Sequence, residues 1–270
     1  MLKFVQQKLR QKTQTRAKKA KRPSLFWFLT EAGRATAELG ISYPYRKLFT
    51  DHTQGDGHPV LVIPGFMSTD VSTVHLRRYI SNMGYRALPW ELGRNYGKTE
   101  FIEQLSIQIE QIHAQYSEKV SLIGWSLGGI FARQLGKRHP DKVRQIITLG
   151  SPFKGVGEGN NVAWIYNLLK GTNQVAPASE DLLEEIPASA PVPTTAIYTK
   201  QDGIVPWRLC MEEESYLHQN IEVRGSHFGL GHNLSVMRIV ADRLQYREEN
   251  WVAFRTDNVL EDWFLYPSVG

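Results

Sequence analysis

Apolar residues recur along the chain with two different periods, and the two kinds of stretch follow one another. Short apolar runs predict six strands, at residues 60–63, 85–88, 120–123, 144–149, 193–199 and 220–224. Apolar residues spaced by three and four predict helices at residues 73–83, 99–117, 127–138 and 234–244. This alternation predicts an α/β fold with a mostly parallel, doubly wound sheet flanked by helices.

Four regions follow from these patterns. Residues 1–22 form a basic tail, and residues 23–50 hold an N-terminal helical segment. Residues 51–250 carry the alternating elements, and residues 251–270 form an aromatic C-terminal extension. Within the main domain, residues 153–193 break the alternation with glycine, asparagine and proline around one apolar run, so we expect a small cap insertion there.

Composition is ordinary for a globular domain. The chain has 270 residues, of which 41% are hydrophobic and 22% are charged. No apolar run approaches the roughly 18 residues of a transmembrane helix. The single cysteine, Cys210, excludes an intramolecular disulfide and favours a reducing compartment, so we expect a cytoplasmic protein.

Positive charge is concentrated at the N-terminus. Residues 1–22 contain nine Lys or Arg and no acid, whereas the whole chain has a net charge of +5. No apolar segment follows these cations as it would in a secretory signal. After Pro23 a helix is predicted to Leu39, and its apolar residues share one face: Leu25, Phe28, Ala32 and Leu39.

Two interpretations of this N-terminus stay open. In the first, residues 1–29 bind an anionic membrane surface through cations and exposed aromatic side chains, and the protein is peripheral to the inner membrane surface. In the second, a disordered solubilising tail precedes a helix packed against the core. Clustered cations also attract nucleic acid, but no nucleic-acid-binding module accompanies them, so we do not expect a nucleic-acid partner.

A G-x-S-x-G pentapeptide, Gly-Trp-Ser-Leu-Gly, occupies residues 124–128 between a predicted strand and a predicted helix. This pattern is typical of a sharp turn that exposes a serine hydroxyl, with glycines where side chains would collide. The sequence therefore predicts Ser126 as a nucleophile. The strand before it and the helix after it argue against the alternative of an ordinary turn serine.

An acid and a histidine follow Ser126 in chain order, each just past the end of a predicted strand. Asp202 follows the fifth predicted strand, and His227 follows the sixth. The carboxyl ends of parallel strands meet at one edge of a sheet, where loops can bring distant side chains together. The three residues are therefore expected to converge there.

Rival residues exist for both partners of the serine. His232 is the alternative base, although it precedes Asn233, which we expect to cap the following helix. Rival acids come before the fifth predicted strand, but they look like the solvent face of a short helix: Glu180, Asp181, Glu184 and Glu185. Asp202 and His227 are therefore preferred.

Five stretches resemble the α/β-hydrolase superfamily, and more narrowly its bacterial lipases and esterases: residues 58–66, 124–129, 148–152, 202–206 and 225–231. The resemblance implies an α/β-hydrolase fold with serine, acid and histidine in this chain order. It also implies a serine hydrolase of small-molecule or lipid carboxylic esters. Such an enzyme forms an acyl-enzyme that water cleaves, without a metal or an organic cofactor.

Each predicted residue has a defined task in such a hydrolase. His227 takes the proton of Ser126 and returns it to the leaving group, while Asp202 holds the imidazole tautomer. Two backbone N–H groups stabilise the oxyanion, and the resemblance assigns them to Leu127 and Phe66. Phe66 also fits a simple turn after the first predicted strand, because a proline and a glycine precede it.

The predicted cap lies where it could line an acyl pocket. The residues expected to contact an apolar substrate are Trp164, Ile165, Tyr166, Leu168 and Leu169. A helix packed on the domain is the alternative for this stretch. For the whole chain, a thioesterase or acyltransferase would use the same serine, and a non-catalytic membrane adaptor on a hydrolase scaffold is the alternative from another class.

Overall fold

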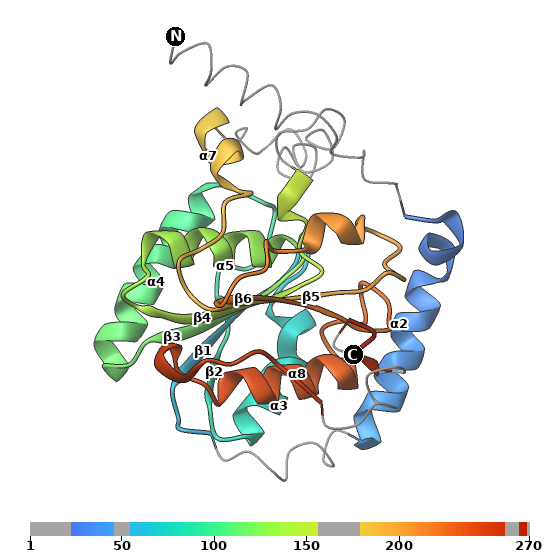
Figure 1. The fold of residues 1–270 in the computed structure, drawn as a ribbon, viewed down its shortest axis with the longest axis horizontal. Coiled ribbons are helices and arrows are strands. Elements are labelled where there is room, and N and C mark those ends of the chain that lie inside the picture. The colour runs from blue at the N-terminus through green and yellow to red at the C-terminus, as the bar shows by residue number, and fades with distance from the viewer. Residues whose placement is uncertain (1–22, 46–54, 156–178, 257–264, 269–270) are drawn as a thin grey trace.

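The computed structural model describes residues 23–45, 55–155, 179–256 and 265–268. Within these ranges six strands form one sheet, in the order β2-β1-β3-β4-β5-β6, and every neighbouring pair is parallel (Figure 1). The strands are β1 (Pro59–Ile63), β2 (Arg86–Leu88), β3 (Val120–Trp125), β4 (Val143–Leu149), β5 (Thr194–Tyr198) and β6 (His218–Glu222). The prediction of a doubly wound parallel sheet is confirmed.

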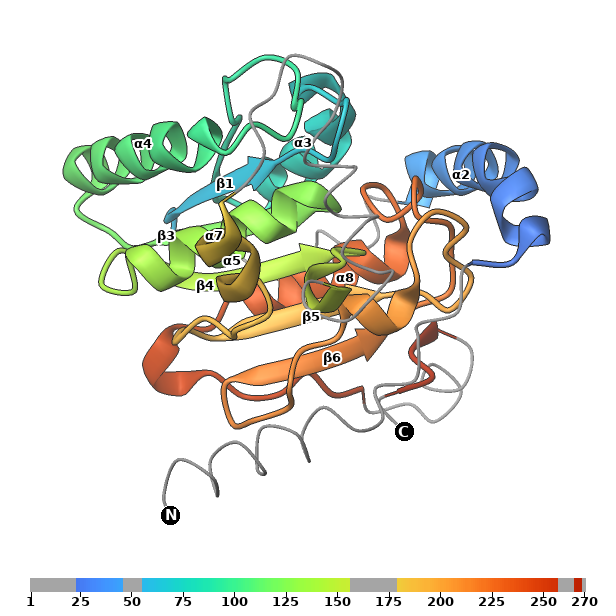
Figure 2. The ribbon, with the colours of Figure 1, turned by 90° about the horizontal axis from the view of Figure 1, so that it is seen from above.

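Helices cover both faces of the sheet (Figures 1 and 2). They are α3 (Val74–Asn82), α4 (Glu100–Tyr116), α5 (Leu127–Arg138) and α8 (Leu234–Leu244). On β1, Leu61 and Ile63 pack with α4 and α5, whereas Val60 and Val62 pack with α3 and α8. Successive side chains of a strand point to opposite faces, so a strand covered on both sides is apolar throughout.

Most predicted elements agree with the structure within one or two residues. The helices predicted at 127–138 and 234–244 have the observed bounds of α5 and α8. The Asn233 side chain caps α8, as predicted, by accepting the N–H groups of Ser235 and Val236. The last strand was predicted at 220–224 and is observed two residues earlier, at His218–Glu222. It ends at Glu222 because its partner Tyr198 is the last residue of β5, so no strand residue remains to pair with Val223.

The N-terminal helix α2 (Leu25–Tyr45) lies beside the carboxyl ends of the strands and continues past the predicted end at Leu39 (Figures 1 and 2). Its apolar N-terminal residues face solvent, since Leu25 is 71% exposed and Phe28 is 56% exposed. The buried residues on the face turned to the domain are Glu31, Ala35 and Ser42. Packing of α2 therefore uses its more polar face. None of the described helices combines the length and hydropathy needed to cross a bilayer.

The predicted cap is described in part. Helix α7 (Glu180–Glu185) exposes Asp181 and Glu184 and packs Leu182 against the core, as its pattern predicted. The predicted pocket residues lie outside the described residues: Trp164, Ile165, Tyr166, Leu168 and Leu169. Their contact with a substrate stays a prediction.

Part of the C-terminal extension packs beside α8. Phe254 and Tyr266 are buried, and their ring centres are 5.1 Å apart. The Tyr266 hydroxyl donates a hydrogen bond to the carbonyl of Ser235 on α8 at 3.3 Å. These aromatic residues therefore extend the core on the side of α3 and α8.

Candidate active site

Ser126 lies on the sharp turn between β3 and α5. Its backbone has φ 53° and ψ −119°, a combination that crowds a Cβ atom and that glycine adopts freely. The Ser126 N–H donates to the carbonyl of Leu149 on β4 at 2.8 Å, and the Ser126 carbonyl accepts the N–H of Gly129 at 3.1 Å. The first bond anchors the turn to the carboxyl edge of the sheet, and the second joins it to the first turn of α5.

Gly128 of the motif allows α5 to approach the sheet closely. A Cβ atom at this position would lie 2.3 Å from the carbonyl oxygen of Ile63 and 2.8 Å from that of Pro64. Because no side chain fits there, the motif requires glycine at this position. Helix α5 therefore starts directly against the end of β1, next to the loop that carries Phe66.

Asp202 follows β5 in a tight loop that fixes its carboxylate. Its Oδ1 accepts the backbone N–H groups of Ile204 at 2.8 Å and Val205 at 2.7 Å. Its other oxygen, Oδ2, lies 2.6 Å from Nδ1 of His227. Asp202 is 3% exposed, so water does not compete for this contact. The structure thus brings together two predicted residues that are 25 positions apart in the chain.

His227 is held on a second side by β3, since the indole N–H of Trp125 donates to the His227 carbonyl at 3.1 Å. With Nδ1 donating to Asp202, Nε2 is the acceptor nitrogen of the ring. Burial by itself lowers the pKa of His227. The charge and hydrogen bond of Asp202, with the charge of Glu31, outweigh burial and raise the pKa above its usual value near 6.5. A raised pKa makes this imidazole a stronger base.

Ser126 and His227 line the same cavity, whose volume is about 340 Å³. The large side chains in its wall are apolar: Phe66, Trp125, Ile204 and Phe228. Pockets of this size with aromatic and aliphatic walls bind apolar groups and use a few polar atoms to orient them. The cavity therefore suits an acyl chain whose carbonyl lies at the serine.

The two residues predicted for the oxyanion role lie beside Ser126. Leu127 is the first residue of α5, and N–H groups in the first turn of a helix have no intrahelical acceptor. Phe66 lines the cavity from the turn after β1. A Cβ atom on Gly65, one residue earlier, would lie 3.3 Å from Cβ of Ser126.

Sequence reasoning missed Asn95, which braces the turn around Phe66. Asn95 is fully buried, and its side-chain amide donates to the carbonyl of Pro64 at 2.8 Å. Its carbonyl accepts the N–H of Met67 at 2.7 Å, and its N–H donates to the carbonyl of Ser68 at 2.9 Å. An asparagine in a loop gives no sequence signal of a partner 31 positions earlier.

The alternative base, His232, makes a different contact. Its Nε2 lies 2.9 Å from the carbonyl of Ala35 on α2, so it links the loop after β6 to that helix. The geometry therefore favours His227 over His232. Among the described residues, no three His, Cys, Asp or Glu side chains are arranged to hold a metal ion.

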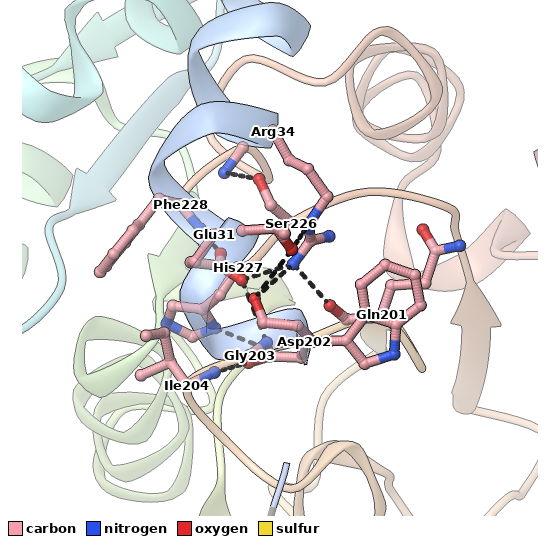
Figure 3. A network of polar contacts seen from close by, with 12 residues as sticks. Glu31, Arg34, Gln201, Asp202, Gly203, Ile204, Ser226, His227 and Phe228 are labelled. Atoms are coloured by element: carbon pink, nitrogen blue, oxygen red, sulfur yellow. Dashed lines mark hydrogen bonds and ion pairs between the residues drawn. The ribbon is translucent and has the colours of Figure 1, made fainter. Parts of the chain in front are cut away.

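Helix α2 contributes a buried carboxylate that the sequence did not indicate. Glu31 is 2% exposed and lies beside the loops of Asp202 and His227 (Figure 3). Its carboxylate accepts the N–H groups of Gly203 and Phe228. A glutamate in an amphipathic helix usually faces solvent, so the pattern alone gives no hint of this role.

A second Ser–His–Asp chain lies at the amino ends of β1 and β3. Nε2 of His58 lies 2.8 Å from Oγ of Ser121, and Nδ1 lies 2.5 Å from Oδ1 of Asp56. Burial and then the charge of Arg144 lower the pKa of His58 to about 4, although Asp56 opposes them. Ser121 has no exposed surface, so a substrate has no access to it, and we interpret this chain as structural.

A model of the palmitoyl protein thioesterase family matches residues 59–220, which is more than half of the chain. The chain belongs to the palmitoyl protein thioesterase family. The matched region runs from β1 into β6 and contains Ser126 and Asp202, whereas His227 lies seven residues beyond its end. The resemblance to α/β hydrolases is thereby confirmed.

Two curated relatives match over shorter stretches. The pimeloyl-[acyl-carrier protein] methyl ester esterase of Aliivibrio salmonicida (strain LFI1238) is 33% identical over 104 residues, which is 37% of this chain and 38% of that protein. The phosphatidylcholine-sterol acyltransferase of Gallus gallus is 28% identical over 127 residues, which is 44% of this chain and 29% of that protein. The chain thus spans well under half of the length of either relative.

Solved structures share the fold over most of the chain. Aspergillus fumigatus lipase B has a TM-score of 0.55 at 17% identity, with 73% of this chain and 55% of the lipase covered. Paleococcus ferrophilus monoacylglycerol lipase has a TM-score of 0.52 at 16% identity, with 71% and 95% covered. These likenesses show the α/β-hydrolase fold. With the family match, the chain is an α/β hydrolase of the lipase, esterase and thioesterase type.

Proposed function

We propose that the chain cleaves carboxylic esters through a serine acyl-enzyme, with Ser126 as nucleophile, His227 as base and Asp202 as the acid that orients the base. The observation that carries this proposal is the 2.6 Å contact between Asp202 and His227, whose ring lines one cavity with Ser126. Serine, imidazole and carboxylate are the groups that acyl transfer to serine requires. The proposed chemistry uses only these side chains, backbone donors and water.

In the first half-reaction, the Ser126 hydroxyl attacks the ester carbonyl while Nε2 of His227 accepts its proton. Asp202 keeps Nδ1 protonated and stabilises the imidazolium. The N–H groups of Phe66 and Leu127 donate to the oxyanion, and one such donor is worth about 3–4 kcal/mol. The leaving group takes the proton from His227 as the intermediate collapses. Water then attacks the acyl-serine with the same general base and releases the acid.

An apolar acyl group is the proposed substrate feature, because four large apolar side chains line the cavity. We propose that the cap extends this pocket through Trp164, Ile165, Tyr166, Leu168 and Leu169. A thioester is the second candidate substrate, and the match to the palmitoyl protein thioesterase family favours it. Ester and thioester differ in the leaving group, while the attack by serine is the same.

A membrane surface is the proposed setting of this reaction. Four residues at the start of α2 are between 56% and 72% exposed: Leu25, Phe26, Phe28 and Leu29. Nine cations within residues 1–22 precede them, and each cation adds on the order of 1 kcal/mol of attraction to an anionic surface. The protein would then be cytoplasmic and peripheral to the inner membrane surface.

Vesicle sedimentation tests the membrane proposal. We expect binding to vesicles with phosphatidylglycerol and much weaker binding to phosphatidylcholine alone. The double variant Phe26→Ser/Phe28→Ser should bind less, whereas Ile107→Ser on α4, where the native side chain is 59% exposed, should bind as wild type. Equal loss in both variants, or no dependence on anionic lipid, would contradict this part of the proposal.

A fluorophosphonate probe tests the nucleophile, because it reacts covalently with activated serines. Wild type should be labelled and Ser126→Ala should not. Ser121→Ala, in the second Ser–His–Asp chain, is the matched control and should be labelled as wild type. Absence of labelling in folded wild type, or labelling that survives Ser126→Ala, would favour a non-catalytic membrane adaptor.

A matched substrate panel then separates the candidate reactions. Acyl chains of several lengths are presented both as p-nitrophenyl esters and as thioesters, and kcat/KM is compared at each length. Higher kcat/KM for the thioesters would favour a thioesterase. Formation of a new ester in the presence of a competing alcohol would favour an acyltransferase.

A further inference from the structure

The carboxylate of Glu31 bridges the two loops that carry the proposed acid and base. Its Oε2 accepts the N–H of Gly203 at 3.1 Å, and its Oε1 accepts the N–H of Phe228 at 2.9 Å. Gly203 directly follows Asp202, and Phe228 directly follows His227. One side chain of α2 therefore holds the backbone immediately after each of these two residues (Figure 3).

Arg34, one turn further along α2, contacts the residues that precede Asp202 and His227 in the same two loops. Its guanidinium donates to the carbonyl of Gln201 at 3.0 Å and to that of Gly225 at 3.2 Å. It also pairs with Glu31 at 2.8 Å. Gln201 directly precedes Asp202, and Gly225 lies two residues before His227. Glu31 thus accepts N–H groups just after Asp202 and His227, and Arg34 donates to carbonyl groups just before them (Figure 3).

We propose that the Glu31–Arg34 pair positions Asp202 and His227 for catalysis by fixing the distance between their loops. The proposal rests on the function proposed above and adds two positioning residues to it. A displacement of about 1 Å between reacting groups can lower a rate by about 100-fold. Two loops that are bonded to one rigid carboxylate cannot drift apart without breaking a buried, charge-assisted hydrogen bond.

Stability alone is a poor explanation for this pair. Glu31 loses its hydration on burial, while the Arg34 side chain stays 21% exposed. An ion pair in which a charge is desolvated gains little over well-packed apolar side chains. The N-terminal part of α2 also has the apolar residues that would pack on a core, yet it exposes them and buries Glu31 instead. A positioning role requires α2 to present polar side chains to the loops of the proposed acid and base, and Glu31 and Arg34 meet this requirement.

The charge of Glu31 also reaches His227. The charged groups that face His227 and its loop are Asp202 after β5, Glu31 and Arg34 on α2, and Glu38 on α2, which accepts the N–H of Ser226 at 2.8 Å. The charge of Glu31 contributes to the raised pKa of His227. Removal of that charge should therefore lower the pH at which His227 loses its proton.

Glu31→Gln is the sharpest test, because the amide has the shape of the carboxylate but only one acceptor oxygen. Its NH₂ group would face one of the two backbone N–H groups and repel it. On a short-chain p-nitrophenyl ester we expect kcat to fall by about 10- to 100-fold, with KM changed less than about twofold. The acidic limb of the kcat/KM profile should move to lower pH. Arg34→Lys, which keeps the charge and loses the planar fork, should lower kcat in the same direction.

Asp56→Asn is the matched control, because it removes a carboxylate from the second Ser–His–Asp chain at the other end of the sheet. All rates are expressed per folded molecule, measured by circular dichroism at the assay temperature. The control should keep kcat and the acidic limb of wild type. A folded Glu31→Gln or Arg34→Lys with wild-type kcat, or a loss of kcat per folded molecule equal to that of the control, overturns the positioning role.

The failure of the proposed function gives a different result. If wild type shows no Ser126-dependent labelling by the fluorophosphonate, both proposals fall together. If wild type is labelled and hydrolyses the ester, and Glu31→Gln hydrolyses it at the same rate with an unmoved pH profile, only the positioning role of the Glu31–Arg34 pair is wrong. Reduced kcat with a shifted acidic limb in Glu31→Gln, and neither change in Asp56→Asn, supports it.

Discussion

Replacing Ser126 by glycine should make the protein more stable while removing the proposed nucleophile. The serine has φ 53° and ψ −119°, where a Cβ atom collides with the backbone. Such strained conformations cost about 1–3 kcal/mol each. Glycine adopts this conformation without strain, but it adds roughly 0.5–1 kcal/mol of backbone entropy to the unfolded chain. The expected net stabilisation of Ser126→Gly is therefore between about 0 and 2.5 kcal/mol, centred on about 1 kcal/mol.

The assay compares thermal and urea unfolding of Ser126→Gly with that of Ser126→Ala. Alanine keeps the Cβ atom and the strain, so it removes the hydroxyl alone. For a chain of this size, 1 kcal/mol corresponds to about 2–4 °C in Tm, and we expect Ser126→Gly to unfold a few degrees above Ser126→Ala. Both variants should lack esterase activity and fluorophosphonate labelling.

Ser117 provides a calibration within the same protein. It ends α4 with φ 54° and ψ 28°, a left-handed conformation that lies within an allowed region. Ser117→Gly should therefore raise the free energy of unfolding less than Ser126→Gly does. If Ser126→Gly is no more stable than Ser126→Ala, the turn at Ser126 is not strained and the fold stores no conformational energy there.

Three further predictions concern the proposed acid Asp202, His58 of the second Ser–His–Asp chain, and the wall of the cavity. Asp202→Asn should lower kcat by about 10⁴-fold, because the amide favours the wrong tautomer of His227, while urea unfolding stays cooperative; a variant with wild-type turnover would exclude Asp202 as the acid. The pKa of His58 is lowered to about 4, so between about pH 6.5 and 4 the unfolded state binds a proton that the folded state does not. The free energy of unfolding should therefore fall by up to about 3 kcal/mol as the pH falls through this window. Urea unfolding of His58→Gln should show a smaller fall over the same pH range. A fall as large as that of wild type would exclude His58 as its source. Ser72→Trp places an indole in the cavity wall and should lower kcat/KM for long acyl chains by about tenfold or more relative to acetyl esters, whereas an unchanged ratio would place the acyl chain elsewhere.

Local patterns were sufficient to predict most of the fold and the proposed acid and base. The bounds of α5 and α8 agree with the sequence because each helix begins at a recognisable turn or cap, the G-x-S-x-G motif and Asn233. Asp202 and His227 were found because each follows an apolar strand, and parallel strands end at a common edge. In both cases the signal lies within about ten residues of the element that it predicts.

Contacts between distant segments could not be predicted in this way. Glu31 accepts N–H groups that lie 172 and 197 positions away in the chain, and no periodicity within α2 indicates such partners. Its helix has an apolar face, and in the structure the N-terminal part of that face is turned to solvent. The same limit applies to Asn95, whose role depends on a turn formed by another part of the chain.

The hydrogen-bonded chain of Ser121, His58 and Asp56 and the proposed triad of Ser126, His227 and Asp202 contain the same residue types in different electrostatic surroundings. His58 is buried beside Arg144, a cation that opposes its protonation, and its pKa falls to about 4. His227 is equally buried, but the carboxylates of Asp202 and Glu31 favour its charged form, and its pKa is raised. In the proposed mechanism the imidazole gains a proton during serine attack, and of these two environments only the one around His227 favours the charged form that this step produces. The electrostatic difference comes from the neighbours of each histidine, and for His227 one of those neighbours belongs to α2.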